Sequence, residues 1–183
     1  CSVLFDIGNS ADAFLVLRAQ ERGVSVVGVL WMLLAFNVVY AVVSTPAGSL
    51  SDRVPRKWEV CGGWCIYAGV YLGFALVDSP TQVALLYVVY GVYHGLVAGA
   101  GKALVADLVS EELRGTGYGK YAAVIGLVSL PASVLAGVLW EGFGAWSGFG
   151  AAAPFWLGAV TALVAAVLLL LTVPAEPGTS ARG

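Results

Sequence analysis

Long apolar runs separated by short polar stretches dominate the sequence. A helix that crosses a bilayer needs about 20 mainly apolar residues, and a membrane β-barrel would instead show alternating positions over about 10 residues. The runs are long and continuous, so they predict an all-α membrane protein. We expect six transmembrane helices, the first of them short, at about 1–17, 24–44, 58–77, 81–105, 118–140 and 151–173, followed by a tail at 174–183.

The composition supports a membrane protein and excludes several other classes. Hydrophobic residues make up 60% of the 183 residues and charged residues 11%, whereas soluble domains carry about 25% charged residues. The net charge is -2 and no basic block occurs, which gives no electrostatic basis for binding nucleic acid. We therefore expect membrane lipid, and no nucleic acid, as a partner.

The cysteines do not predict a metal site or a cofactor. Cys61 and Cys65 lie four residues apart within an apolar run, and a metal site would need more ligands and polar support. We interpret them as small packing residues and expect no cofactor. The chain begins with Cys1, and its only methionine is Met32. We therefore expect a part of a longer protein, with a lipid-modified Cys1 as the weaker alternative.

Lysines and arginines in the loops predict an orientation. Cytoplasmic loops of membrane proteins carry an excess of these residues. Counting the loops after the second and fourth helices and the tail gives six Lys and Arg, against two for the loop after the first helix and none for the other two loops. This count omits Lys102, whose depth is ambiguous. We expect the richer side and the C-terminus to be cytoplasmic, in a cell or inner membrane.

A short pattern occurs twice along the chain. Ala47-Gly-Ser-Leu-Ser-Asp-Arg-Val54 and Ala136-Gly-Val-Leu-Trp-Glu-Gly-Phe143 share Ala-Gly-x-Leu-x-acid-x-apolar. The copies end the second and fifth predicted helices, which are equivalent positions in two three-helix units. Because three spans per unit turn the second unit over, the pattern predicts two inverted three-helix repeats, a plan common among transporters. A chance match is the alternative.

The loop after the second helix resembles the signature loop of major facilitator transporters. It reads Gly48-Ser-Leu-Ser-Asp52-Arg53-Val-Pro55-Arg56-Lys57, and the family pattern is Gly, three residues, Asp, a base, any residue, Gly and two bases. Pro55 replaces the second glycine, and proline cannot adopt the positive φ that glycine allows. The turn geometry should therefore differ from that of the family.

Three further stretches look like the second half of bacterial major facilitators. These are Gly8 to Ala19, Lys102 to Val109, and Glu111 to Thr116 with Gly119 after it. The resemblance covers nearly the whole chain. It implies a six-helix bundle that forms helices seven to twelve of a twelve-helix transporter, with an N-terminal six-helix half as partner and a small molecule of unknown identity as substrate.

The resemblance also implies a cytoplasmic gate. Charge-assisted pairs at helix ends can hold one face of an alternating-access transporter closed. The alternative is that these charges only set topology and remain solvated. The expected gate residues are Gly48, Asp52, Arg53, Arg56, Lys57, Asp107 and Arg114.

Polar residues within the first and fourth helices predict a substrate or proton pathway. In the family these two helices line the central path. A charge at the bilayer centre costs about 2.5–3.5 kcal/mol, so Asp6 should face water, substrate or a partner, and it could carry a proton. The alternative for Asp6 is pairing with a polar group of the missing half or of a neighbouring helix, and the alternative for His94 is a local hydrogen-bond partner. Asp12 and Arg18 lie nearer the outer end, which favours a structural role for them, and Lys102 could instead snorkel to the surface. The expected pathway residues are Asp6, Asn9, Asp12, Tyr87, Tyr90, His94 and Lys102.

Two other classes of function compete with a proton-coupled secondary transporter. An intramembrane serine hydrolase needs a Ser–His pair, and His94 is the sole histidine; no paired aspartates occur in a Gly-x-Gly-Asp setting. We therefore expect no enzymatic activity. A non-transporting receptor or assembly factor on the same fold stays open, because fold does not determine function.

Overall fold

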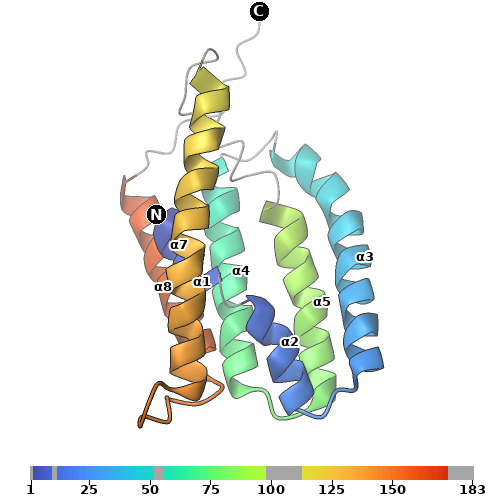
Figure 1. Ribbon diagram of the computed structural model, residues 1–183. Coiled ribbons are helices and arrows are strands. Elements are labelled where there is room, and N and C mark those ends of the chain that lie inside the picture. Colours follow the sequence, from blue (N-terminus) through green and yellow to red (C-terminus); the bar gives the residue numbers. More distant parts are fainter. Residues whose placement is uncertain (1, 10–11, 52–55, 98–112, 173–183) are drawn as a thin grey trace, which may run out of the picture.

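The computed structural model describes residues 2–9, 12–51, 56–97 and 113–172, all of them helical or in short connections (Figure 1). Neighbouring long helices run antiparallel, as short connections require. The helices are α1 (Ser2–Asn9), α2 (Asp12–Glu21), α3 (Val26–Ser51), α4 (Arg56–Leu76), α5 (Pro80–Val97), α7 (Arg114–Glu141) and α8 (Ala153–Thr172).

Four of the described helices are long and apolar enough to cross a membrane. The qualifying segments are Val26–Ala47, Lys57–Leu76, Gly115–Glu141 and Ala153–Thr172. They confirm the predicted second, third, fifth and sixth spans to within a few residues. The described part of the fourth predicted span is α5, and its remainder falls in 98–112, outside the described residues.

The helix predicted at 1–17 corresponds to α1 and α2, and residues 10 and 11 between them lie outside the described residues. Its end differs from the prediction, because α2 continues to Glu21. The prediction counted Arg18 in the loop after this helix. Arg18 is buried, so its charge does not end the helix. Similarly, α3 continues past Pro46 to Ser51, since membrane helices tolerate an internal proline.

The two helices α4 and α8 pack against each other at the centre of the bundle. The short helix α1 packs on α8 and α7, and α5 lies between α3 and α4 (Figure 1). Aromatic rings surround α4: within the helix, Tyr67 stacks on Tyr71 with ring centroids 4.0 Å apart, and Phe74 stacks on Phe155 of α8 at 5.8 Å. The core is therefore an aromatic layer built around α4.

Large apolar side chains on α3 and α7 face outward. They include Trp31, Leu34 and Val42 on α3 and Leu127 and Leu130 on α7. An exposed apolar surface of this extent requires lipid or another protein to cover it. This agrees with the composition, which leaves more apolar surface than a bundle of this size can bury.

A local capping motif explains where α2 ends. The C-terminus of α2 is a Schellman motif: the amide of Gly23 donates to the carbonyl of Gln20 at 2.9 Å, and that of Val24 donates to Ala19 at 3.0 Å. Such a motif needs a residue with positive φ, and Gly23 has φ 84°. α2 therefore ends at a turn that the sequence specifies.

At the start of α5, Ser79 and Pro80 form the helix N-terminus. The amide of Gln82 donates to Ser79 Oγ at 3.4 Å, and Gln82 Oε1 accepts from the amide of Asp78 at 3.1 Å. These bonds satisfy two backbone donors near a helix start, where donors otherwise lack partners. Pro80 occupies a position that suits its fixed φ. The turn between α4 and α5 is thus well defined.

Replacing Gly23 with alanine should destabilise the protein by about 1 kcal/mol, because a Cβ is unfavourable in the left-handed conformation. The Cβ itself would contact nothing within 4 Å, so backbone strain is the only cause. Thermal unfolding in detergent would measure the change. Gly115→Ala is the matched control, since Gly115 is helical and its Cβ would also meet open space. Equal melting temperatures for the two variants would contradict the capping role.

Candidate functional site

The first predicted pathway residues, Asp6 and Asn9, lie on α1, which packs between α7 and α8. Both residues are half-buried. The oxygens Asp6 Oδ2 and Asn9 Oδ1 are withdrawn from the surface, and Asn9 Oδ1 has no hydrogen-bond partner among the residues that the structure describes. Asp12 begins α2, but its side chain is outside the described part of the structure. α1 therefore brings two polar groups into the bundle.

The position of α1 depends on a close approach to α8. A Cβ built on Gly8 would lie 2.7 Å from the Cα of Gly158 and would also collide with Thr161 Oγ1. Phe5 is buried and stacks on Trp64 of α4 with ring centroids 5.0 Å apart. Small residues on one side of α1 and an aromatic ring on another thus determine where Asp6 and Asn9 lie.

The predicted pathway residues of α5 are placed in the aromatic core. Tyr87 and Tyr90 are 3% and 4% exposed. Tyr87 packs edge-on against Phe74 of α4, and Tyr90 lies 5.7 Å from Tyr93 by ring centroids. These contacts pack the side chains within the bundle and do not test whether the two tyrosines line a solute path. That role stays a prediction.

His94 is half-buried near one end of the described part of α5. Its ring meets those of Phe36 on α3, Tyr90 and Tyr93 nearly edge to face, at 5.3, 4.7 and 5.0 Å. The structure therefore joins α5 to α3 through this histidine. Asp6 and His94 belong to separate helices that meet through Phe5 and Tyr93, whose centroids are 6.4 Å apart.

The predicted gate is only partly within the described residues. Asp52, Arg53 and Asp107 lie outside them, as does Lys102 of the pathway, and for Gly48, Arg56 and Arg114 only the helical backbone is described. Lys57 is described fully: it is 8% exposed, and its Nζ donates to the carbonyl of Leu170 at 3.0 Å. Leu170 is in the last turn of α8, so Lys57 binds the negative end of that helix.

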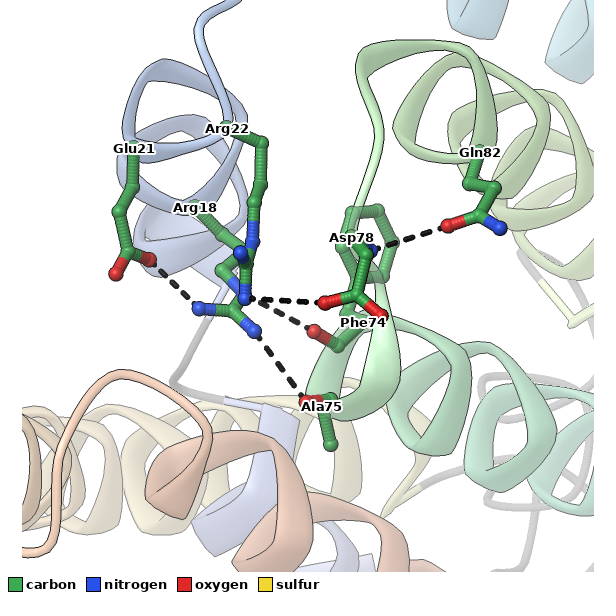
Figure 2. Close-up of polar contacts among 7 residues, drawn as sticks. All are labelled: Arg18, Glu21, Arg22, Phe74, Ala75, Asp78 and Gln82. Carbon is green, nitrogen blue, oxygen red and sulfur yellow. Dashed lines mark hydrogen bonds and ion pairs between the residues drawn. The ribbon is translucent and has the colours of Figure 1, made fainter.

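Sequence reasoning missed this contact of Lys57 and the full role of Arg18. Arg18 was interpreted as structural, but the pattern does not reveal its partners, which are backbone carbonyls far along the chain (Figure 2). Every residue has a backbone carbonyl, so the sequence does not indicate which carbonyl binds an arginine. The position of Arg18 directly after a long apolar run is the signal that it could be buried, and a buried cation requires partners.

A shallow cavity of about 340 Å³ opens between α4 and α5. Its walls are apolar apart from Gln82, and none of the predicted pathway residues is among those lining it: Gly73, Leu76, Val77, Gln82, Leu85 and Leu86. The cavity therefore gives no support for a solute path in this part of the bundle.

Comparisons with known proteins identify the family of this chain and several relatives. The family model described as Major Facilitator Superfamily matches residues 1–183. The uncharacterized MFS-type transporter MJ1317 of Methanocaldococcus jannaschii is 37% identical over 175 residues, which cover 92% of this chain and 42% of the relative. The inner membrane transport protein YajR of Escherichia coli is 30% identical over 139 residues, covering 76% of this chain and 29% of YajR.

A third relative carries a name that states a cargo. The staphyloferrin B transporter of Staphylococcus aureus is 27% identical over 127 residues, which cover 67% of this chain and 30% of that transporter. The chain thus spans less than half the length of each of these three relatives.

Proposed function

The chain belongs to the major facilitator superfamily, and from this premise we propose that it forms one six-helix half of a secondary transporter that moves a small solute by alternating access. The observation that carries the proposal is the family match over residues 1–183. The relatives named as transporters and the four membrane-spanning helices support it.

The proposed architecture is a pair of inverted three-helix units: α1–α2, α3 and α4 in one, α5, α7 and α8 in the other. In this plan α1–α2 corresponds to α5, α3 to α7, and α4 to α8. The contact of α1 with α7 then corresponds to that of α5 with α3, and the contact of α1 with α8 corresponds to that of α5 with α4. All four contacts occur, and the α4–α8 contact corresponds to itself. Ala47 and Ala136, which begin the two copies of the repeated pattern, are both buried, at 5% and 2% exposure. This symmetry of contacts supports the inverted plan.

We further propose that a second six-helix bundle is the partner of this one. The apolar faces of α3 and α7 support this, because both are largely exposed in the described structure. The relatives are more than twice as long as the region they share with this chain, which leaves room for such a bundle. Transport would then be a rocking of the two bundles about a site between them.

The orientation is also a proposal. The loop charges favour a cytoplasmic location for the end at which α4 begins and α8 stops. The bond from Lys57 to Leu170 places these two ends on the same side. The expected gate residues Gly48, Asp52, Arg53, Arg56, Asp107 and Arg114 cluster by sequence at the same face. In that arrangement the turn between α4 and α5 faces outward.

Solute flux into proteoliposomes that contain the full-length protein tests transport. We expect saturable uptake or efflux of a solute that a binding screen identifies. Binding of that solute with no flux under an ion gradient or a concentration gradient would favour the alternative, a receptor or assembly factor on the same fold. Empty liposomes and liposomes that contain heat-unfolded protein are the controls.

Proton coupling through Asp6 is a more specific part of the proposal. If the Asp6 carboxylate carries the proton, Asp6→Asn should lower pH-driven uptake by about tenfold or more while leaving solute binding in place, because the amide cannot release a proton. Uptake driven by a pH gradient would measure this. Asp78→Asn is the control, since the Asp78 side chain is 84% exposed in the α4–α5 turn. Full pH-driven uptake by Asp6→Asn would exclude Asp6 as the proton carrier.

A further inference from the structure

A buried guanidinium group lies in the last turn of α2. Arg18 is 3% exposed, and burial of a charge is unfavourable unless the charge is paired and hydrogen-bonded. Arg18 Nε donates to the carbonyl of Phe74 at 3.1 Å, one terminal nitrogen donates to Ala75 at 3.3 Å, and the other meets Glu21 Oε2 at 2.7 Å (Figure 2). Each nitrogen of the side chain therefore has an acceptor.

The two carbonyls that Arg18 binds have no acceptor role within their own helix. α4 ends at Leu76, and the last four carbonyls of a helix lack intrahelical donors. They also carry the negative end of the helix dipole. Arg18 thus satisfies two carbonyls of α4 and is itself neutralised by that helix end together with Glu21. The planar guanidinium reaches three acceptors in fixed directions, which a lysine ammonium cannot reproduce.

Neighbouring contacts connect the same end of α2 to the start of α5. Arg22 lies 3.8 Å from the carboxylate of Asp78, and the amide of Asp78 binds Gln82 of α5 (Figure 2). The Arg22–Asp78 pair is exposed and long, so it contributes little. Arg18 is therefore the main polar connection between α2 and the α4–α5 turn.

α1 and α2 contact different parts of the bundle. α1 packs on α8 and α7, and Gly8 lies directly against Gly158 of α8. α2 contacts α3 and is bonded to the end of α4.

We propose that Arg18 is a positioning residue that holds α2 on the end of α4, so that α2 follows α4 and α5 when the bundle changes conformation. The movement itself rests on the proposed function, alternating access. The docking of α2 by Arg18 does not, and it can be measured without any solute.

Hydrogen exchange of the full-length protein in lipid nanodiscs tests the docking. In Arg18→Gln, we expect exchange to rise about tenfold in α2 and in the last turn of α4, and to stay unchanged in α1 and α8. Arg18→Lys should give a smaller rise at the same places, because one ammonium cannot serve all three acceptors. Asp78→Asn is the matched control and should leave exchange in α2 at the wild-type level.

Each outcome decides the proposal. Faster exchange limited to α2 and the α4 end supports it, whether or not the protein transports any solute. Wild-type exchange in α2 of either Arg18 variant overturns it. A rise that extends equally over α1, α7 and α8 also overturns it, since Arg18 would then support the bundle as a whole. If Arg18→Gln does not fold, the comparison of Arg18→Lys with wild type decides by the same criteria. Loss of flux with unchanged exchange would count against the docking role and leave the transport proposal standing.

Discussion

Replacing Lys57 with methionine is expected to destabilise the protein by about 2 kcal/mol and to loosen the last turn of α8. Lys57 is 8% exposed, and its Nζ donates to the carbonyl of Leu170 at 3.0 Å. Methionine keeps the length and apolar stem of the side chain but has no donor, so it leaves a carbonyl at the end of a helix without this partner. A hydrogen bond to a charged group contributes about 1.5–3 kcal/mol. Thermal unfolding in detergent and hydrogen exchange at the end of α8 would measure the two effects.

Lys120→Met is the matched control, because Lys120 is exposed on α7. It should change the melting temperature little. The comparison also separates two roles of Lys57. A residue that acts only in a gate between two bundles would change the flux and leave the end of α8 protected. A residue that caps α8 would instead lower the melting temperature and the protection of the end of α8. Identical melting temperatures for Lys57→Met and Lys120→Met would contradict the capping role.

Replacing Gly8 with alanine should push α1 away from α8 and lower the stability by a net of about 1 kcal/mol. The added Cβ would lie 2.7 Å from the Cα of Gly158 and would collide with Thr161 Oγ1. Overpacking costs about 1–3 kcal/mol, against a gain of about 1 kcal/mol from the better helix propensity of alanine. Since α1 carries Asp6 and Asn9, the shift should also reduce flux in the full-length protein.

Gly62→Ala in α4 is the control, because a Cβ there meets nothing within 4 Å. It should be neutral or slightly stabilising, through helix propensity alone. Thr161→Ala combined with Gly8→Ala should recover part of the loss, since it removes the hydroxyl but leaves the backbone of Gly158 in place. A Gly8→Ala protein as stable as Gly62→Ala would show that α1 does not depend on this contact.

The helices were predictable because lipid imposes a simple length and polarity rule on them. Runs such as Val26–Ala47 and Ala153–Thr172 satisfy that rule without any knowledge of tertiary contacts. The first span was harder. Its end was predicted before Arg18, which the prediction counted in the following loop. Hydropathy treats every arginine as solvated, and a buried arginine bonded to distant carbonyls violates that assumption.

The candidate site was less predictable than the helices. Periodicity placed Tyr87, Tyr90 and His94 on one side of a helix, but it could not say what that side faces. In the structure the two tyrosines pack in the aromatic core with α4, and His94 packs against Phe36 of α3. Which neighbour a helical stripe meets depends on the rotation and position of the helix, and these follow from packing with all of its neighbours at once.

By itself, the sequence determined that this protein belongs in a membrane, that it is helical, and that it has the loop and helix patterns of its family. These properties depend on local composition and spacing, which each segment carries alone. Only the tertiary structure decided that Arg18 binds the end of α4 and Lys57 the end of α8, and that Gly8 lies against Gly158. Those contacts join residues far apart along the chain through backbone atoms, which are the same in every residue and so leave no trace in the sequence.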